Sequence, residues 1–378
     1  MVYSIGNLLY TFDTQFLLDM DVYNNINAVE NDIRQPFFAI FSLPFTILPR
    51  FISSITFAEI YPFLIAIVQG FIVFVSIILL EKMMKLKGIS KLLFIIFMCV
   101  TYPTLLFLFN MEQYVIHVFY LIVFIYMSIN NIKDKDMLFI MASGTLVTSG
   151  IFFPLLGEKN NFKQSIKNIF FTFLKFVAIL IISSKVLILM PDHLKLKADI
   201  FSDFYGETLS FNDRVNMYTN FALNTVIAPK VEVNNSILAT QMMISDDYKY
   251  HLVAYNPAIN QTNNKEINVF GVIILAMAIV GFILNRKDSF SKICFVWLLF
   301  SFVLLPIIGY GADENGFILY SYYFSWAFVC LIFKLFETLF KNHSKIKNVV
   351  YTLSIIPIAI INFYGIYQLI EFGIQYFI

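Results

Sequence analysis

The hydrophobic positions of this chain fall into long blocks instead of alternating or amphipathic patterns. Six blocks contain no ionised side chain and approach the roughly 20 apolar residues that a helix needs to cross a bilayer. They are residues 61–80, 92–110, 269–284, 293–309, 317–333 and 349–370. Lipid offers the backbone no hydrogen-bonding partner, so segments of this kind must be helical. The pattern therefore predicts an all-α protein that crosses a membrane many times.

Short hydrophilic stretches between the blocks differ in charge. The basic ones are residues 81–91, 130–136, 157–168, 285–292 and 334–348, and they hold more than half of the 26 Lys and Arg residues. The others lean acidic and are residues 13–35, 110–113, 191–268 and 310–316. Cytoplasmic loops are enriched in Lys and Arg. This rule places the basic stretches inside and the acidic stretches outside.

Two apolar segments do not fit as single spans under this topology. Segment 36–54 contains three prolines and Arg50, which is typical of a juxtamembrane or re-entrant element. Segment 137–156 lies between two basic stretches, and its centre reads Ser-Gly-Thr and then Thr-Ser-Gly. We expect it to break into two half-helices that enter and return. The alternative makes both segments full spans and moves residues 81–91 and 130–136 outside.

The favoured topology has about eight full spans, one broken hairpin and one juxtamembrane segment. It divides the chain into an outer acidic loop with the juxtamembrane segment, a first bundle containing the hairpin at 137–156, an outer loop, and a second bundle. These regions are residues 1–60, 61–190, 191–268 and 269–378.

Composition narrows the possible functions. Only 13% of residues are charged and the net charge is +1, so no basic surface suggests nucleic acid as a partner. The sequence lacks a Gly-rich phosphate loop and a His-Glu-x-x-His motif, and its four histidines have no metal-ligand spacing. ATP-driven transport and zinc-dependent hydrolysis therefore have no support.

An acidic pair offers the clearest candidate chemistry. Asp19 and Asp21 follow an apolar run, so we expect them at the outer interface. Carboxylates that are poorly solvated gain a raised pKa, which suits a general base. Spaced two residues apart, they can also share a divalent cation. The simpler interpretation is an acidic outer loop without a catalytic role, and spacing alone leaves the metal question open.

The neighbouring residues strengthen the functional interpretation. Leu18-Asp19-Met20-Asp21, followed by Arg34-Gln35-Pro36-Phe37-Phe38, resembles the first outer loop of type C glycosyltransferases (GT-C), which are polytopic enzymes that use polyprenyl-phosphate sugars. Bacterial members show an Asp-rich segment after the first helix, then Arg and a His-Pro-Leu-Phe-like helix start. The resemblance implies that Asp21 is the catalytic carboxylate and Asp19 its neighbour. Gln35 stands where the family has His.

Two later stretches are similar to other parts of the same family. Glu112-Gln113-Tyr114 is expected at the outer tip of a helical hairpin, on the same side as Asp21. Asp313-Glu314-Asn315 and the aromatic stretch 319–326 resemble a late outer loop and helix. The family begins with a complete membrane helix, whereas the apolar residues before Asp13 amount to about half a span. A truncated helix, a misplaced start and a lost helix all fit this difference.

The resemblance implies a specific reaction on the outer face of the bacterial cytoplasmic membrane. Asp21 would deprotonate the hydroxyl of a glycan or lipid acceptor, which attacks the sugar with inversion. Arg34 or Arg50 would hold the departing lipid phosphate, with Gln35 near the substrate. Asp19 or Glu112 would hold a metal or the acceptor.

Two other functions stay open from sequence alone. A transporter or flippase of lipid-linked sugars would use Lys175 and Lys185, which lie in the apolar segment 168–190. Charged residues within a membrane often mark a transport pathway, although both lysines can also snorkel to an interface. A non-catalytic partner in glycan assembly is the third possibility.

Overall fold

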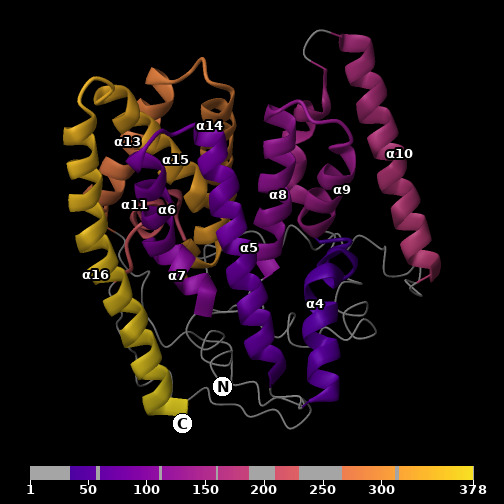
Figure 1. Cartoon of the computed structure of the whole chain (residues 1–378), viewed down its shortest axis with the longest axis horizontal. Helices are drawn as coiled ribbons and strands as arrows, with labels where there is room; N and C mark the ends of the chain where they lie inside the picture. Colours follow the sequence, from indigo (N-terminus) through magenta and orange to yellow (C-terminus); the bar gives the residue numbers. More distant parts are fainter. Residues whose placement is uncertain are drawn as a thin grey trace. The chain divides into compact units, whose positions relative to one another are not determined.

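The computed structural model describes residues 35–56, 60–109, 113–158, 161–186, 209–229, 266–310 and 315–377. These residues are almost entirely helical, and the only pairing of extended backbone among them is an isolated bridge between Glu158 and Asn161. The predicted all-α class is confirmed (Figure 1). The chain divides into two compact units, with unit 1 formed by residues 1–14, 80–112 and 201–378 and unit 2 by residues 15–79 and 113–200.

Several helices are long and apolar enough to cross a membrane. Among the described residues they are Phe63–Met84, Ser289–Ile308, Ser321–Leu339 and Ser344–Glu371. A fifth span is formed if Ile89–Val100 and Tyr102–Leu108, which are bent by 59° at their junction, are counted together. The protein is thus an integral membrane protein with several spans.

The predicted number of eight spans is not reached among the described residues. Three of the expected spans are not among the candidates. Helices Gln113–Ile129 and Val269–Leu284 have fewer residues than a full span, and helix Phe162–Val186 does not appear among the candidate spans.

Unit 2 is built from short helices around a broken hairpin. Its elements are α4 (Phe38–Ile55), most of α5 (Ile60–Met84), α8 (Gln113–Ile129), α9 (Asp136–Thr145), the 3-10 helix η1 (Val147–Leu156) and α10 (Phe162–Val186). Helix α9 packs along α8, and α4 begins beside the far end of α9 (Figure 1). Pro44 and Pro49 lie inside α4 without ending it. The segment predicted as juxtamembrane is therefore one continuous helix.

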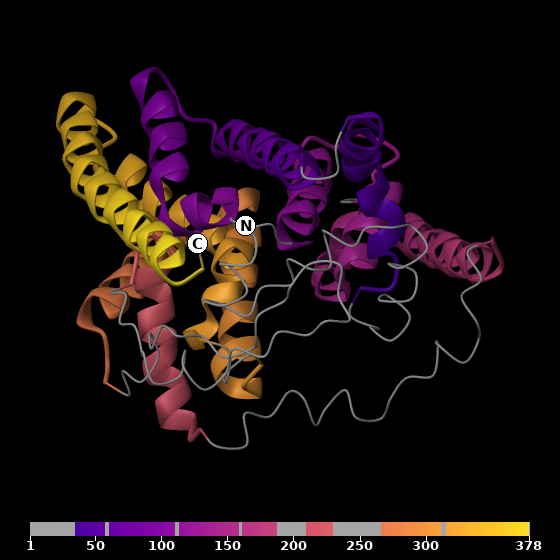
Figure 2. The ribbon, with the colours of Figure 1, turned by 90° about the horizontal axis from the view of Figure 1, so that it is seen from below.

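Unit 1 contains the longer helices. Its elements are the end of α5, α6 (Ile89–Val100), α7 (Tyr102–Phe109), α11 (Phe211–Asn224), α13 (Val269–Leu284), α14 (Ser289–Phe302), the π-helix η4 (Val303–Ile308), the 3-10 helix η5 (Asn315–Tyr320), α15 (Ser321–Leu339) and α16 (Ser344–Phe377). Helix α16 runs alongside α6 and α7 (Figures 1 and 2). Polar caps start α11, α13 and α14, with Ser210, Asn268 and Asp288 each accepting a first-turn amide.

Helix α15 forms the core of unit 1. Trp297 of α14 and Trp326 of α15 both donate their indole N–H to the carbonyl of Tyr323, at 2.9 and 3.0 Å. Helix α13 approaches α15 closely at Gly281, where an added Cβ would lie 2.1 Å from the carbonyl oxygen of Leu331. Small residues allow this closeness in membrane helix pairs, where dispersion contacts replace the hydrophobic effect.

Helix α11 lies within the region predicted as an outer loop. Its Tyr218, Phe221 and Ala222 are fully buried, and the Tyr218 hydroxyl lies 2.6 Å from Ser301 Oγ of α14. Because its hydropathy is low, the pattern of apolar blocks did not predict this helix. A signal was nevertheless present, because Ser210 and Asp213 form an N-terminal cap ahead of buried positions at helical spacing.

Candidate functional site

The broken hairpin of unit 2 brings polar groups into an apolar bundle. Helix α9 ends at Thr145, Leu146 is extended, and η1 begins at Val147. The Thr145 hydroxyl donates to the carbonyl of Ala142 at 3.0 Å. Short hydroxylated side chains compete in this way with the helical backbone, and glycine adds flexibility. The sequence Ser-Gly-Thr thus accounts for the break.

Both ends of the hairpin lie next to each other. The Lys135 ammonium, just before α9, donates to the carbonyl of Leu155 at the end of η1. Asn168 Nδ2 of α10 donates to the neighbouring carbonyl of Leu156 at 3.4 Å. The segment therefore returns to the side from which it starts, which brings the basic stretches 130–136 and 157–168 together.

His117 of α8 joins the two halves of the hairpin. Its Nδ1 lies 3.0 Å from Thr145 Oγ1, and its Nε2 lies 3.0 Å from Ser149 Oγ. Because Thr145 gives its own hydrogen to Ala142, its oxygen must accept from His117 Nδ1–H. In the neutral tautomer protonated at Nδ1, Nε2 accepts the Ser149 hydroxyl. All three side chains are buried.

The start of α4 is seated against this break. The Phe37 amide donates to the carbonyl of Gly144 at 2.8 Å, and the Tyr120 hydroxyl donates to the carbonyl of Phe41 at 2.7 Å. An added Cβ on Gly144 would lie 2.7 Å from Phe37 Cδ2 and 2.8 Å from Phe41 Cε2. Gln35, which precedes the helix, is buried. The start of α4, which follows the acidic segment in sequence, is therefore packed in the interior of unit 2.

The residues that the sequence singled out are distributed unevenly. Asp19, Asp21, Arg34 and Glu112 lie outside the described residues. Gln35 precedes α4, whereas Arg50 lies near its far end, so roughly 20 Å of helix separates the two at 1.5 Å per residue. The structure does not bring these two substrate-binding candidates into one site.

The two lysines considered for transport lie in α10. Lys175 of α10 forms an ion pair with Asp136 at the start of α9. Lys185 lies in the last turn of α10. No group of three or more His, Cys, Asp or Glu side chains suited to hold a metal occurs among the residues that the structure describes.

Unit 1 has a polar centre of its own at a second helix break. Asn362 of α16 is buried and donates through Nδ2 to the carbonyls of Val100 and Val226, both at 2.7 Å. Its Oδ1 accepts the amide of Ala228 at 2.6 Å. One side chain thus joins α16, the junction of α6 with α7, and the segment that follows α11. No pattern in the sequence indicated these long-range contacts.

Arg214 of α11 is a second residue that sequence reasoning missed. It is half-buried, and among the described residues its buried Nε has no hydrogen-bond partner. Its guanidinium lies over Gly309 at the end of η4, where a Cβ would come within 2.3 Å of Nη1. Arginine presents a planar fork of donors that suits carboxylate or phosphate.

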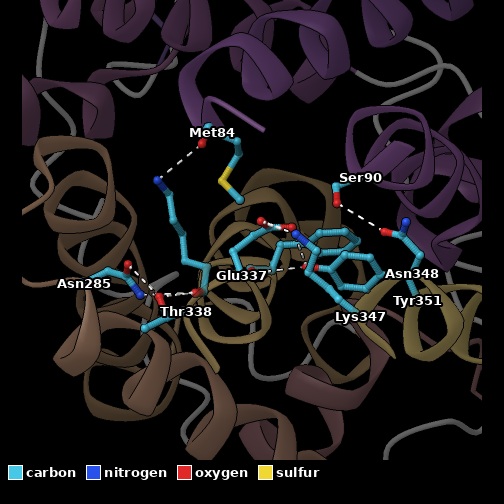
Figure 3. Close-up of polar contacts among 10 residues, drawn as sticks. Met84, Ser90, Asn285, Glu337, Thr338, Lys347, Asn348 and Tyr351 are labelled. Carbon is cyan, nitrogen blue, oxygen red and sulfur yellow. Dashed lines mark hydrogen bonds and ion pairs between the residues drawn. The ribbon is translucent and has the colours of Figure 1, made fainter. Parts of the chain in front are cut away.

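A charged network closes one end of unit 1 (Figure 3). Lys347 Nζ lies 2.7 Å from Glu337 Oε2, and the Tyr351 hydroxyl donates to Glu337 Oε1 at 3.1 Å. The Lys334 ammonium lies 3.1 Å from Asp288 and donates to the carbonyl of Met84 at 3.4 Å. These contacts join the basic stretches 81–91, 285–292 and 334–348 at one end of the unit.

Fold and site together define an all-helical, multi-pass membrane protein with polar groups placed at helix breaks. No family model, curated protein or solved structure matches the chain.

Proposed function

We propose that the chain is a membrane glycosyltransferase that moves a sugar from a polyprenyl-phosphate carrier to a glycan or lipid acceptor. It would act on the outer face of the bacterial cytoplasmic membrane. The observation that carries the proposal is the burial of Gln35 and the bond from the Phe37 amide to Gly144. Through these contacts, the start of α4, which follows the Asp-x-Asp motif in sequence, packs against the broken hairpin.

Broken helices suit a substrate with a polar head and a lipid tail. Non-helical backbone at membrane depth is tolerated where it is buried in protein or lines a cavity. Around the break at Leu146, the side chains of Gln35, His117 and Ser149 supply buried polar groups. A sugar needs such groups for orientation, while the apolar helices beside them can accommodate a polyprenyl chain.

In the proposed reaction, Asp21 accepts the proton of the acceptor hydroxyl, whose oxygen attacks the anomeric carbon. The bond between that carbon and the phosphate oxygen breaks, and the lipid phosphate leaves with its negative charge. A guanidinium stabilises that charge by bidentate hydrogen bonds. Arg34 and Arg50 are the candidates. Asp19 or Glu112 holds the acceptor or a divalent cation.

A transporter of lipid-linked sugars is a weaker proposal. It would use Lys175 and Lys185 of α10. The Lys175 ammonium pairs with Asp136 at the start of α9. An ion pair at a helix end needs no transport role to explain it.

The decisive experiment measures polyprenyl phosphate released from a panel of polyprenyl-phosphate hexoses. The identity of this product is the same whichever sugar is transferred and whichever acceptor receives it. Asp21→Asn should lower release by about a hundred- to ten-thousand-fold, since an amide cannot accept the proton. Asp13→Asn, in the same acidic segment but outside the Asp-x-Asp motif, is the matched control. Equal release by both variants would remove Asp21 from the mechanism.

A second experiment identifies the cation that holds the phosphate. Arg34→Lys and Arg50→Lys both keep the charge but lose the planar fork. The variant of the phosphate-binding arginine should need a higher donor concentration for half-maximal release. A residue that only anchors its helix at the interface should tolerate Lys, because either side chain can snorkel. Unchanged donor curves for both variants would refute a bidentate phosphate contact by these arginines.

A further inference from the structure

One end of unit 1 carries far more cations than its acidic residues can neutralise. The turn between α5 and α6 and the turn between α13 and α14 lie side by side, because Lys334 contacts both Met84 and Asp288. The Asn285 side chain donates to the carbonyl of Lys334 at 3.2 Å, which ties the second turn to α15 (Figure 3). Three loops thus form one surface, which we call the basic face.

Every acidic side chain of these loops is already paired. Glu81 binds Lys91 at 3.5 Å, Asp288 binds Lys334, and Glu337 binds Lys347. The other cations of the basic face are exposed and form no ion pair with a described acidic residue. They are Lys82, Lys85, Lys87, Arg286, Lys287, Lys292, Lys341 and Lys345.

Exposed apolar side chains border the same cations. Ile89 and Leu92 follow Lys87, Leu284 precedes Arg286, and both Leu339 and Ile346 flank the loop that contains Lys341; all five are 47–62% exposed. These residues begin or end apolar helices, two of which belong to candidate membrane spans. A ring of apolar surface that meets a ring of cations marks the depth at which lipid tails give way to headgroups.

We propose that the basic face binds the headgroups of anionic phospholipids. Charge complementarity argues for an anionic occupant, and the adjoining apolar rim argues for a lipid over a soluble acidic protein. Exposed lysines and arginines at this depth are drawn to anionic leaflets, and each contributes about a five-fold gain in association. This interaction does not depend on glycosyl transfer, and it applies equally if the proposed function fails.

The test compares two charge-matched pairs of substitutions in the full-length purified chain. Arg286→Gln with Lys287→Gln removes two cations from the basic face. Lys163→Gln with Lys167→Gln removes two exposed cations from α10 of unit 2. Binding is measured by titrating the detergent-solubilised protein with short-chain phosphatidylglycerol and, separately, with short-chain phosphatidylcholine. Taking the difference between the two lipids for each variant cancels any general loss of stability.

The native chain should bind phosphatidylglycerol more tightly than phosphatidylcholine, and added salt should reduce the difference. The basic-face pair should weaken phosphatidylglycerol binding by roughly 25-fold, with phosphatidylcholine binding unchanged. The α10 pair should have a much smaller effect. Equal affinity for the two lipids would overturn the proposal and favour a soluble acidic partner. An equal loss in both variants would overturn the assignment to this face.

Discussion

Each unit contains a helix break that is held by a buried polar side chain from a neighbouring helix. In unit 1, Asn362 binds the Val100 carbonyl at the end of α6 and the backbone of Val226 and Ala228 after α11. In unit 2, His117 binds two hydroxyl groups on either side of Leu146. The first contact set is wholly between a side chain and the backbone, whereas the second includes two side-chain hydroxyl groups.

This difference separates a structural junction from a candidate site. An amide does not titrate, and Asn362 uses its oxygen and both its N–H contacts on backbone groups, two of which would otherwise be unpaired. His117 and Ser149 are hydrogen-bonded through their side chains, and a substrate hydroxyl can replace one partner in such a bond. Unit 2 also contains the buried Gln35, two residues before the Phe37 amide that binds Gly144. We therefore expect unit 1 to respond to mutation in stability and unit 2 to respond in function as well.

The largest effect should come from Asn362→Leu. It leaves the Ala228 amide and the Val100 carbonyl without their partner, whereas the Val226 carbonyl keeps the amide of Tyr102 at 3.1 Å. Each orphaned group costs about 1–3 kcal/mol, so we expect a loss of about 3 kcal/mol in unfolding free energy. Thermal unfolding in detergent measures it. Asn348→Leu on the same helix loses only one 3.4 Å contact to Ser90 and should have a small effect.

Gly144→Ala should be the next most damaging change. The new Cβ would collide with the rings of Phe37 and Phe41 and push α4 away from the hairpin. Overpacking of this kind costs about 1–3 kcal/mol. Gly150→Ala is the matched control, since an added Cβ there meets nothing within 4 Å. If both variants unfold at the same temperature, α4 is not seated on Gly144 as described.

His117→Leu should cost about 1–2 kcal/mol, which is less than Asn362→Leu, because Thr145 keeps its bond to Ala142 and only the Ser149 hydroxyl loses its acceptor. His117→Gln restores an acceptor and should recover much of the stability. Donor turnover in His117→Leu should fall by more than the loss of folded protein explains. A turnover that follows folded protein alone would make this break a structural junction like the one at Asn362.

The smallest effect should be a pH dependence at the charged end of unit 1. Burial by itself raises the pKa of Asp288, but the Lys334 ammonium and the hydrogen bonds from Ser291 outweigh it and lower that pKa. A lowered carboxyl pKa stabilises the fold above the usual value of about 3.9, and this contribution is lost as pH falls through the lowered pKa. Because the pair is partly exposed, less than about 1 kcal/mol is expected.

Melting temperatures of the native chain and of Asp288→Asn across acidic pH measure this contribution. Their difference should be present near neutral pH and shrink as pH falls below about 4. Asp134→Asn, in an exposed turn, is the control and should show no such difference. A difference in melting temperature that stays constant with pH for Asp288→Asn would mean that the Lys334 ammonium does not stabilise the fold through the charge of the carboxylate.

The sequence could predict the membrane class because that property depends on local hydropathy. The blocks around residues 61–80 and 349–370 form long helices because lipid leaves the backbone no alternative. The number of spans could not be predicted as reliably. Proline at position 103 and the contacts of Asn362 favour a bend between α6 and α7, and the second of these arises from residues far apart in the chain.

The candidate site was predictable only in part. The Ser-Gly-Thr and Thr-Ser-Gly pair indicated a weak point at 143–150, and α9 does end there. His117 carried no sequence signal, because a lone histidine in an apolar helix looks the same whether it bridges two segments or only fills space. Arg214 was overlooked because α11 lies in a region of low hydropathy.

The central claim is that the polar break of unit 2 binds the head of a polyprenyl-phosphate donor. A photoreactive short-chain polyprenyl phosphate tests it directly when cross-linked peptides of the full-length chain are identified by mass spectrometry. We expect labelling within residues 35–55 and 136–156, suppressed by unmodified polyprenyl phosphate and not by the corresponding polyprenol. Labelling confined to the helices of unit 1, or equal suppression by the polyprenol, would contradict the claim.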